Sequence, residues 1–365
     1  MLYYNNNTVF KKITDVINGN QLNRIIDKYN SDYRTQHFDT RSHITSMLYL
    51  QLSGTQSLRG LIDKLNYNLK LQKIINVPSL SQLSRKNANR DYRVFEDLYH
   101  AVVAKAKSKL GIREINEKFK EIKAFDSSII NIASSLAPDL YHEGEKSGMK
   151  ISALLNISQG FPENVQIVPA KVSDRRCIDG FINDKNSLYL FDRGYYNYAW
   201  YDKLTDDGYK FITRQVSNAT TEEMKSTYVK NDLVFDYEIT MGTDYSRNKT
   251  HNTYREILTF NEDNEEIRIL TNVFNISAEE IIELYRLRWK IELFFKWIKQ
   301  NLKIKRWLGH NENAIKIQIY SALIAYVILA LLKLEIDNDI SIKSLTRIIN
   351  MNLLEDKSCL LLLSG

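Results

Sequence analysis

A run of uncharged, mostly apolar residues from 317 to 332 constrains the fold of this chain more than any other stretch. Lys316 and Lys333 bracket the run, which is shorter than the roughly 18 residues that a membrane-spanning helix needs. A helix that is apolar on every side has to be surrounded by protein. We therefore expect a fully buried core helix and no membrane association. A chain of 365 residues, 44 % of them hydrophobic, is long enough to enclose such a helix.

The first 115 residues have the apolar spacing of helices. Pro78-Ser79 is a helix-start signal, and the polar segment 84–90 (Ser-Arg-Lys-Asn-Ala-Asn-Arg) follows it. A helix at 56–66, a short break and this capped helix could together form a helix-turn-helix that binds DNA. The alternative is a plain helical bundle with a polar face.

Near residue 120 the pattern changes to that of strands. Residues 121–126 have the pattern of a strand that ends on Asp126, and residues 187–192 form an apolar strand that ends on Asp192. Residues 217–270 are polar and rich in turns, and they predict an all-β insertion. Its strand candidates are 233–240, 254–260 and 266–272. Mixed strands and helices of this kind predict an α/β fold.

The most basic part of the chain surrounds a single carboxylate, Glu292. Between residues 286 and 306 there are eight Lys or Arg and one acid, a net charge of +7, against +6 for the whole chain. On one continuous helix, five side chains fall within roughly 80° of one another: Tyr285, Arg288, Glu292, Lys296 and Lys299. Such cationic rows attract the phosphate backbone of nucleic acids. Glu292 either pairs with its neighbours along the helix or binds a metal ion that separates it from phosphates.

Asp126, Asp192 and Glu292 are the candidate metal ligands. Acids at the carboxyl ends of parallel strands point into a shared cleft, and ligand sets of oxygen atoms suit Mg²⁺ or Mn²⁺. Two such ions about 4 Å apart can activate an attacking oxygen and stabilise a leaving one. The six histidines are scattered, which argues against a zinc site. An Asp after a strand, taken alone, is more often a helix cap or a turn residue.

Together these segments resemble the DDE transposases of bacterial insertion sequences, specifically the IS-four family. The hallmark of that family is Tyr, two residues, Arg, three residues, Glu, six residues and Lys, and every spacing is met here. The matching residues are Tyr285, Arg288, Glu292 and Lys299. Phe125-Asp126-Ser127-Ser128 is similar to the context of the first family Asp. Leu190-Phe191-Asp192-Arg193-Gly194-Tyr195 is similar to that of the second.

The resemblance implies a ribonuclease-H-like catalytic core with an all-β insertion, preceded by a helical N-terminal domain that binds DNA ends. The expected division is 1–115 for the N-terminal domain, 116–216 and 271–335 for the two parts of the core, 217–270 for the insertion and 336–365 for a C-terminal tail. It further implies cut-and-paste transposition: hydrolysis at the transposon end, a hairpin, its opening, and strand transfer into target DNA.

By the same resemblance, Asp126, Asp192 and Glu292 would hold two Mg²⁺ or Mn²⁺ ions. Tyr285, Arg288 and Lys299 would contact phosphates beside the cleavage point. Lys296 and Arg193 are further candidate DNA contacts, although Arg193 could instead orient Asp192. Arg214 at a strand end is a DNA contact or an ordinary surface residue. For Trp289 and Trp297 we expect core packing rather than base stacking.

The implied partners are double-stranded DNA, as terminal inverted repeats and target, and a second copy of the chain in the synaptic complex. The implied location is the bacterial cytoplasm, on the nucleoid. Relatives that form hairpins carry a stacking Trp in the insertion, whereas none of the four Trp lies in 217–270 here. Tyr228, Phe235, Tyr237, Tyr245 or Tyr254 could substitute. The alternatives are a decayed transposase that acts as a DNA-binding repressor, or a Mg²⁺-dependent nuclease on the same core.

Overall fold

The computed structural model divides the chain into two compact units, each of which is described by itself. The first comprises Met1–Gly111, Ile130–Met149 and Phe295–Gly365, and the second Ile112–Ile129 and Lys150–Phe294. The residues described are 7–110, 118–133, 141–143, 146–228, 234–243, 249–261, 263–301, 307–336, 340–356 and 358. The residues outside these ranges include Lys303, Lys305, Arg306, Cys359 and Tyr245.

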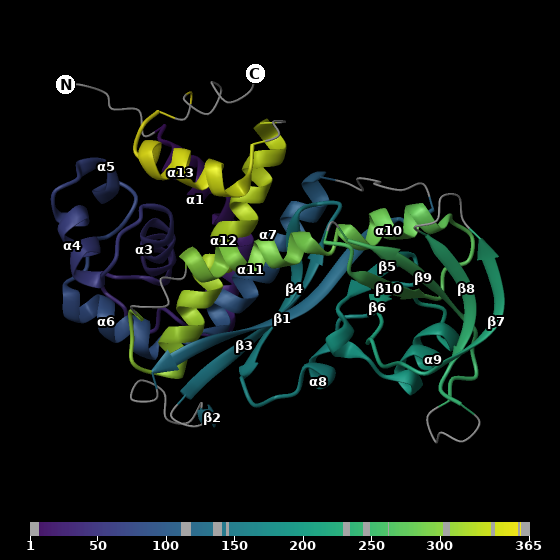
Figure 1. The fold of residues 1–365 in the computed structure, drawn as a ribbon. Helices are drawn as coiled ribbons and strands as arrows, with labels where there is room; N and C mark the ends of the chain where they lie inside the picture. Colours follow the sequence, from purple (N-terminus) through teal and green to yellow (C-terminus); the bar gives the residue numbers. More distant parts are fainter. Residues whose placement is uncertain are drawn as a thin grey trace. The chain divides into compact units, whose positions relative to one another are not determined.

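The first unit is built from helices (Figure 1). They are α1 (Val9–Ile17), α2 (Asn20–Lys28), α3 (Thr40–Leu52), α4 (Leu58–Asn66), α5 (Leu69–Gln72), α6 (Leu80–Asn89), α7 (Arg93–Leu110), α12 (Glu312–Ile336) and α13 (Ile342–Asn352). Several begin at a side chain that accepts a hydrogen bond from a free N–H of the first turn, including Asp39, Ser57 and Ser79. The helical character predicted for the first 115 residues is thus confirmed over the described part.

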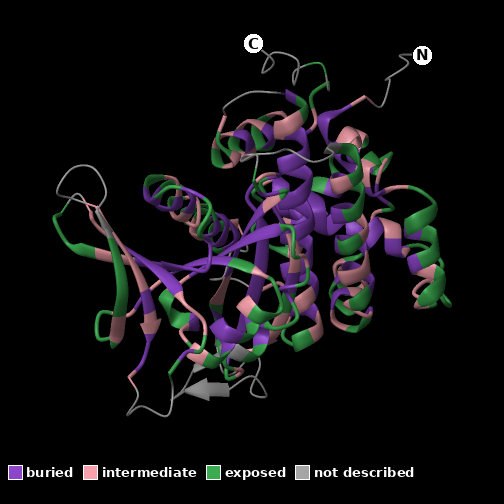
Figure 2. Cartoon of the chain, turned by 90° about the vertical axis from the view of Figure 1, so that its right-hand side faces the viewer, coloured by how far each residue is buried: buried purple, intermediate pink, exposed green. Residues whose placement is uncertain are grey.

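The apolar run 317–332 forms the centre of α12, as predicted. This helix is long and apolar enough to cross a membrane by length and composition, but 94 % of its most apolar window is buried inside the protein. It packs against α3, α6, α7 and α13. Buried positions accordingly concentrate along the central helices and strands (Figure 2). α12 is therefore a core helix, around which the first unit is assembled.

The predicted helix-turn-helix is only partly realised. α4 and α6 pack against each other, but the chain between them runs from 67 to 79 and contains α5. That connection is longer than the turn of three or four residues in a helix-turn-helix. The reason is that Asn68 caps the additional short helix α5, which packs against α4.

The second unit is organised around one sheet (Figure 1), with strand order β2-β3-β1-β5-β6-β10-β9-β8-β7 and with β4 paired to β3 outside this path. Its first strands are β1 (Glu121–Ala133), β3 (Lys146–Asn156), β4 (Phe161–Pro169), β5 (Ser187–Phe191) and β6 (Lys210–Arg214). β1, β5 and β6 are parallel neighbours. β1 and β3 also run into the first unit, where β2 (Tyr141–Glu143) pairs with the start of β3. The expectation of a mixed α/β fold is confirmed.

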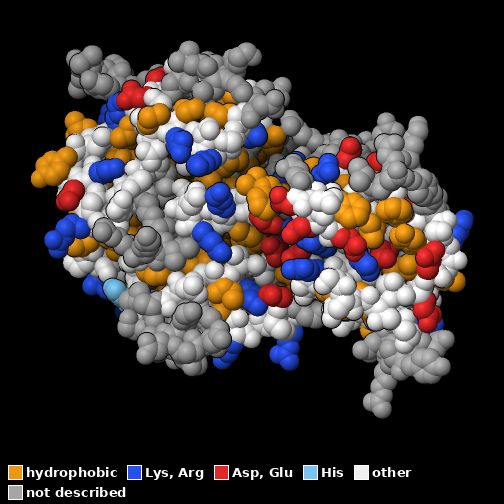
Figure 3. Space-filling model, viewed as in Figure 1, with side chains coloured by type: hydrophobic (Ala, Val, Ile, Leu, Met, Phe, Trp, Pro, Cys, Tyr) orange, Lys and Arg blue, Asp and Glu red, His pale blue; other side chains and the backbone are white. Residues whose placement is uncertain are grey.

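The predicted β segment 217–270 does form strands, which extend the central sheet. They are β7 (Thr221–Tyr228), β8 (Phe235–Met241), β9 (Tyr254–Phe260) and β10 (Glu266–Thr271). β10 joins β6 in antiparallel register. β7 was not predicted because its sequence, Thr-Glu-Glu-Met-Lys-Ser-Thr-Tyr, lacks an apolar face. Charges on such a sheet-edge strand oppose pairing with other chains, and Figure 3 shows acidic and basic side chains intermixed over this part.

An aromatic core fixes the helices of the second unit against β5 and β6. Phe191 lies with its ring centroid 5.4 Å from that of Phe211 and 5.0 Å from that of Trp200. Trp200 belongs to α9 (Tyr198–Asp206), and the remaining helices are α8 (Asp174–Ile178), α10 (Ala278–Arg286) and α11 (Trp289–Asn301). Aromatic pairs of this kind contribute beyond the area that they bury. The packing holds the chain rigidly on both sides of Asp192.

Candidate active site

The strand register brings Asp126 and Asp192 to the same level of the sheet. In the parallel pair β1–β5, Lys123 lies opposite Tyr189 and Ala124 opposite Leu190. Continuing the register by two residues places Asp126 opposite Asp192. Neighbouring strands lie about 4.8 Å apart, and Asp192 directly follows the last residue of β5, so the two acids lie at adjacent positions of neighbouring chain segments. The prediction that this strand ends at Asp126 is wrong, since β1 runs on to Ala133. The isoleucines between Ser127 and Ile132 favour strand structure.

Asp126 is held by a chain of hydrogen bonds. The Ser127 N–H donates to Asp126 Oδ1 over 2.8 Å. The Ser127 hydroxyl lies 2.8 Å from Ser152 Oγ and accepts a hydrogen bond from the Tyr195 phenol over 3.2 Å. Ser152 and Tyr195 are buried. One oxygen of Asp126 is therefore fixed by its own strand, which leaves the other oxygen for a ligand.

Electrostatic interactions reach Asp126 from both Asp192 and Glu292. The pKa of Asp126 is raised to about 6, chiefly by burial and also by the negative charges of Asp192 and Glu292, while the Ser127 N–H and Arg288 oppose the shift. All three acids predicted from sequence lie in the second unit, and the charges of Asp192 and Glu292 act on Asp126. Neighbouring carboxylates disfavour one another's ionised form, and a cation between them would relieve that repulsion.

The predicted continuous helix through 285–299 is wrong, because the chain turns between α10 and α11. α10 ends at Arg286 and α11 begins at Trp289. In the turn the Arg288 N–H donates to the Tyr285 carbonyl over 3.0 Å, and the Ile291 N–H donates to the Arg288 carbonyl over 3.0 Å. These bonds span three residues instead of four, which tightens the backbone. Glu292 consequently lies in the first turn of α11, where a helix N-terminus stabilises negative charge.

Of the two helical neighbours expected to pair with Glu292, Arg288 and Lys296, the structure pairs it with Arg288. Arg288 donates from Nη2 to Glu292 Oε1 over 2.6 Å, and its guanidinium carbon lies 5.8 Å from the centre of the Tyr285 ring. Burial lowers the pKa of Arg288, but Tyr285, the bond to Glu292 and the charge of Asp192 together raise it above its ordinary value. Burial also raises the pKa of Tyr285 to about 12. Both residues keep their ordinary charge state at neutral pH.

The other predicted DNA contacts differ in position. Arg193 is exposed in the short 3-10 turn that directly follows Asp192. Lys296 and Lys299 are exposed on α11, in the part of that helix that belongs to the first unit. Of the two tryptophans expected in the core, Trp297 is buried and donates to Thr346 Oγ1 over 3.0 Å. Trp289 is 58 % exposed, because the turn before α11 aims it at solvent.

Three further residues enter the site from the tertiary structure. The β5–β6 register pairs Phe191 with Thr213, so Arg214 is level with Asp192 on the next strand. The sequence left Arg214 undecided between a DNA contact and a surface position. Tyr195 and Ser152 orient the segment that carries Asp126. Of these two residues, only Tyr195 belongs to a sequence motif that resembles the family. Ser152 carried no signal because its contact depends on the pairing of β1 with β3.

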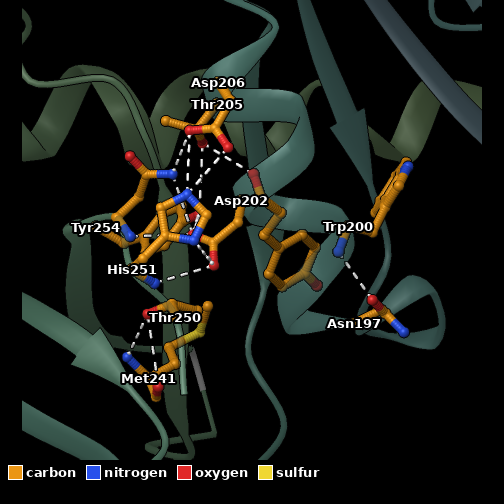
Figure 4. A network of polar contacts seen from close by, with 11 residues as sticks. Asn197, Trp200, Asp202, Thr205, Asp206, Met241, Thr250, His251 and Tyr254 are labelled. Carbon is orange, nitrogen blue, oxygen red and sulfur yellow. Dashed lines mark hydrogen bonds and ion pairs between the residues drawn. The ribbon is translucent and has the colours of Figure 1, made fainter. Parts of the chain in front are cut away.

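A second polar network anchors α9 beyond Asp192 (Figure 4). Asp202 accepts hydrogen bonds from the backbone N–H of His251 over 3.0 Å, from that of Asn252 over 3.1 Å and from the Tyr254 hydroxyl over 2.8 Å. The His251 imidazole lies 3.0 Å from a carboxylate oxygen of Asp206. This network ties the β8–β9 connection to α9 at one side of a cavity of about 670 Å³. It stabilises the second unit and does not involve the three acids.

The three acids fit a hard divalent cation by donor type. They offer carboxylate oxygens only, and burial with mutual repulsion at Asp126 favours a bound cation. Among the residues that the structure describes, no three His, Cys, Asp or Glu side chains form a ready-made metal cluster. Glu292 is turned to Arg288. Because Arg288 bonds one carboxylate oxygen of Glu292, Oε1, metal binding by all three acids would use the other oxygen or displace Arg288.

Comparison with known proteins decides the family. The profile described as the transposase DDE domain matches residues 117–328, which include all three acids. The chain belongs to the DDE transposases. The resemblance inferred from the sequence motifs is confirmed. A second profile, described as a domain of unknown function, matches residues 5–75.

Curated relatives agree with this assignment. A transposase of insertion sequence element IS4SA from Synechocystis is 29 % identical, over 84 % of this chain and 87 % of that protein. A transposase of element IS5377 from Geobacillus stearothermophilus is 25 % identical, over 68 % of this chain and 66 % of that protein. Among solved structures, a piggyBac transposase synaptic complex with hairpin DNA has a TM-score of 0.47 and 8 % identity, covering 96 % of this chain and 80 % of that one.

These findings establish the general activity of this DDE transposase. It is an enzyme that cleaves and transfers DNA strands. Its family generally uses divalent metal ions, in accord with the oxygen-only donor set.

Proposed function

We propose that Asp126, Asp192 and Glu292 are the catalytic metal ligands, and that they hold two Mg²⁺ or Mn²⁺ ions for cut-and-paste transposition. The observation that carries the proposal is the strand register that sets Asp126 beside Asp192, together with the charge of Glu292 acting at Asp126. When bound, a pair of such ions activates an attacking oxygen and stabilises a leaving one.

The protein's own groups prepare the site for DNA. Ser127 and Tyr195 hold Asp126 in one orientation. Arg288 pairs with one oxygen of Glu292, and its planar guanidinium would bind a phosphate through two parallel bonds. Tyr285, Arg214 and Arg193 border the same acids, and we propose that they contact backbone oxygens beside the cleavage point. Lys296 and Lys299 would contact phosphates further along α11.

The proposed reaction is a series of phosphoryl transfers. Water hydrolyses a phosphodiester at the end of the element, the freed 3′-hydroxyl attacks the opposite strand to form a hairpin, and after hairpin opening a 3′-hydroxyl attacks target DNA. The hairpin step calls for an aromatic face on which a displaced base can stack. Tyr254 is fully buried and cannot serve. Phe235 and Tyr237 on β8 are half-buried and remain the candidates.

The strand order β3-β1-β5-β6, with β1, β5 and β6 parallel, supports a ribonuclease-H-like core. We propose that 116–216 and 271–335 are its two parts, with 217–270 as the insertion, 1–115 as an end-binding domain and 336–365 as a tail. The proposed partners are terminal inverted repeats, target DNA and a second copy of the chain. The proposed location is the bacterial cytoplasm, on the nucleoid.

The test of this proposal is Glu292→Gln, with Glu283→Gln as a matched control on the exposed face of α10. Glu292→Gln should abolish metal-dependent cleavage of an end duplex and the joining of pre-cut ends to a target plasmid, and leave duplex binding unchanged. Glu283→Gln should behave as wild type. Full cleavage by Glu292→Gln would refute the assignment. Wild-type binding without any cleavage would indicate a decayed repressor, and cleavage without joining would indicate a nuclease.

A further inference from the structure

One buried arginine joins three segments of the second unit. Arg255 lies on β9, and its side chain is only 10 % exposed. Its Nε and Nη2 atoms donate to the two carboxylate oxygens of Asp236 on β8, over 3.2 and 2.5 Å. Its Nη1 atom donates to the backbone carbonyls of Val273 and Ile276, over 3.0 and 2.8 Å. All three nitrogens of the guanidinium are therefore engaged inside the protein.

The two carbonyls belong to the short segment between β10 and α10, beside the insertion strands (Figure 1). At its start this segment is fixed to β6, because the Asn272 side chain accepts a hydrogen bond from the Phe211 N–H over 3.0 Å. At its end, Ile276 directly precedes Ser277, the N-cap residue of α10. Arg255 therefore holds the backbone at the point where α10 begins.

Burial distinguishes this contact from a second one on the same segment. Asp236 is only 12 % exposed, so loss of either partner would leave the other charge buried and unpaired. A second cation, Lys118, donates to the Asn275 carbonyl over 3.3 Å, but its side chain is 43 % exposed. An exposed ammonium exchanges its contacts with water at little cost. The position of the segment therefore depends mainly on Arg255.

The helix α10 transmits this position to the candidate active site. It has nine residues, Ala278–Arg286, and a length of about 13 Å, and it packs against β6. Tyr285 lies in its last turn, and the tight turn that follows leads directly to Arg288 and Glu292. A shift at the start of this packed helix would move Glu292 relative to Asp126. Displacements of about 1 Å at a reacting centre can cost about 100-fold in rate.

We propose that Arg255 is a positioning residue for the reaction: by tying the start of α10 to β8 and β9, it sets where Glu292 lies relative to Asp126 and Asp192. The inference rests on the proposed function, in which these three acids hold the metal ions. Groups that orient metal ligands without touching the metal commonly change metal affinity or activity by about 10- to 100-fold when they are replaced. Arg255 acts in this way through the backbone of the segment that it holds.

The same strand also carries the candidates for base stacking. Phe235 and Tyr237 flank Asp236 on β8, and successive side chains of a strand point to opposite faces. Arg255 therefore binds β8 on the face opposite the two aromatic rings. The surface proposed to receive a displaced base and the helix that leads to Glu292 are thus held in one frame.

The test compares Arg255→Lys with Arg268→Lys. Lysine keeps the positive charge but lacks the planar fork, so it cannot bond both oxygens of Asp236 and both carbonyls at once. Arg268 is the matched control, because it lies on the neighbouring strand β10 and pairs with two acids of the sheet, Glu256 and Glu266, instead of the segment before α10.

Mn²⁺ affinity is measured without DNA by electron paramagnetic resonance titration, and single-turnover cleavage of an end duplex is measured at saturating protein. Both are recorded at a temperature at which melting curves show each variant to be folded. Arg255→Lys should weaken Mn²⁺ binding and slow cleavage about ten-fold each, and leave the Kd for the duplex unchanged. Arg268→Lys should match wild type in all three measurements. A role in stability alone would lower the melting temperature and change none of them.

Unchanged Mn²⁺ affinity of folded Arg255→Lys would overturn the proposal, whatever its cleavage rate. If that variant is unfolded at the assay temperature, Asp236→Asn decides, because it removes one of the two carboxylate oxygens and the charge that orient the guanidinium. Weaker Mn²⁺ binding by folded Asp236→Asn would then support the positioning role, and wild-type binding would overturn it. Failure of the proposed function is detected separately, since Glu292→Gln would then bind Mn²⁺ and cleave as wild type does.

Discussion

Asp126→Asn should make the metal-free protein more stable at neutral pH. The folded protein raises the pKa of Asp126 from 3.8 to about 6, chiefly through burial. When the pKa of a carboxyl is higher in the folded than in the unfolded protein, ionisation of that carboxyl destabilises the folded state. The free energy of unfolding therefore declines as pH rises from about 4 to about 6, and the full loss of stability is present above that range.

The expected magnitude follows from the shift. A difference of about two units, at 1.36 kcal/mol each, makes ionised Asp126 cost about 3 kcal/mol at pH 7.5. At pH 4.5 only about 1 kcal/mol of that cost has developed. Asn cannot ionise, and its side-chain oxygen can still accept the Ser127 N–H. The melting temperature of Asp126→Asn should then exceed that of wild type by roughly 5–10 °C at pH 7.5 and by less at pH 4.5.

The assay is scanning calorimetry in EDTA at both pH values, followed by the same scans in Mn²⁺. A cation that binds the folded state stabilises it by mass action, so Mn²⁺ should raise the melting temperature of wild type and leave that of Asp126→Asn nearly unchanged. Asp202→Asn is the matched control, because Asp202 is buried and accepts hydrogen bonds from His251, Asn252 and Tyr254. It should lower the melting temperature. Equal or lower stability of Asp126→Asn at both pH values would refute the reasoning.

Two other substitutions test the surroundings of the acids. Arg288→Ala removes the partner of Glu292 and a proposed phosphate contact, so end-duplex binding should weaken and its salt slope should fall by about one; an unchanged slope in an anisotropy titration would contradict this. Tyr195→Phe removes the hydroxyl that donates to Ser127, which should cost about 1 kcal/mol of stability. It should also weaken Mn²⁺ binding several-fold in an electron paramagnetic resonance titration, because Asp126 loses its orientation; wild-type Mn²⁺ affinity would count against that role.

The local structure of this protein was predictable where the pattern of side chains is strong. The uncharged run 317–332 was expected to be a core helix rather than a membrane span, and it is a buried helix. The strand segments before Asp126 and Asp192 form adjacent strands, and the spacing of Tyr285 to Lys299 indicated the family that the profile match supports. β7 was missed for the converse reason, since its charged sequence has no apolar alternation and depends on β8 for its strand form.

The amino-acid sequence by itself determined most helices, most strands and the family, because these depend on residues close together along the chain. Only the tertiary structure decided that Asp126, Asp192 and Arg214 share one level, since strand register is set by contacts between distant segments. It also decided the turn after Arg286, the exposure of Trp289 and the hydrogen bonds from Tyr195 and Ser152. Burial and register are properties of the packed whole, and one-dimensional spacing does not contain them.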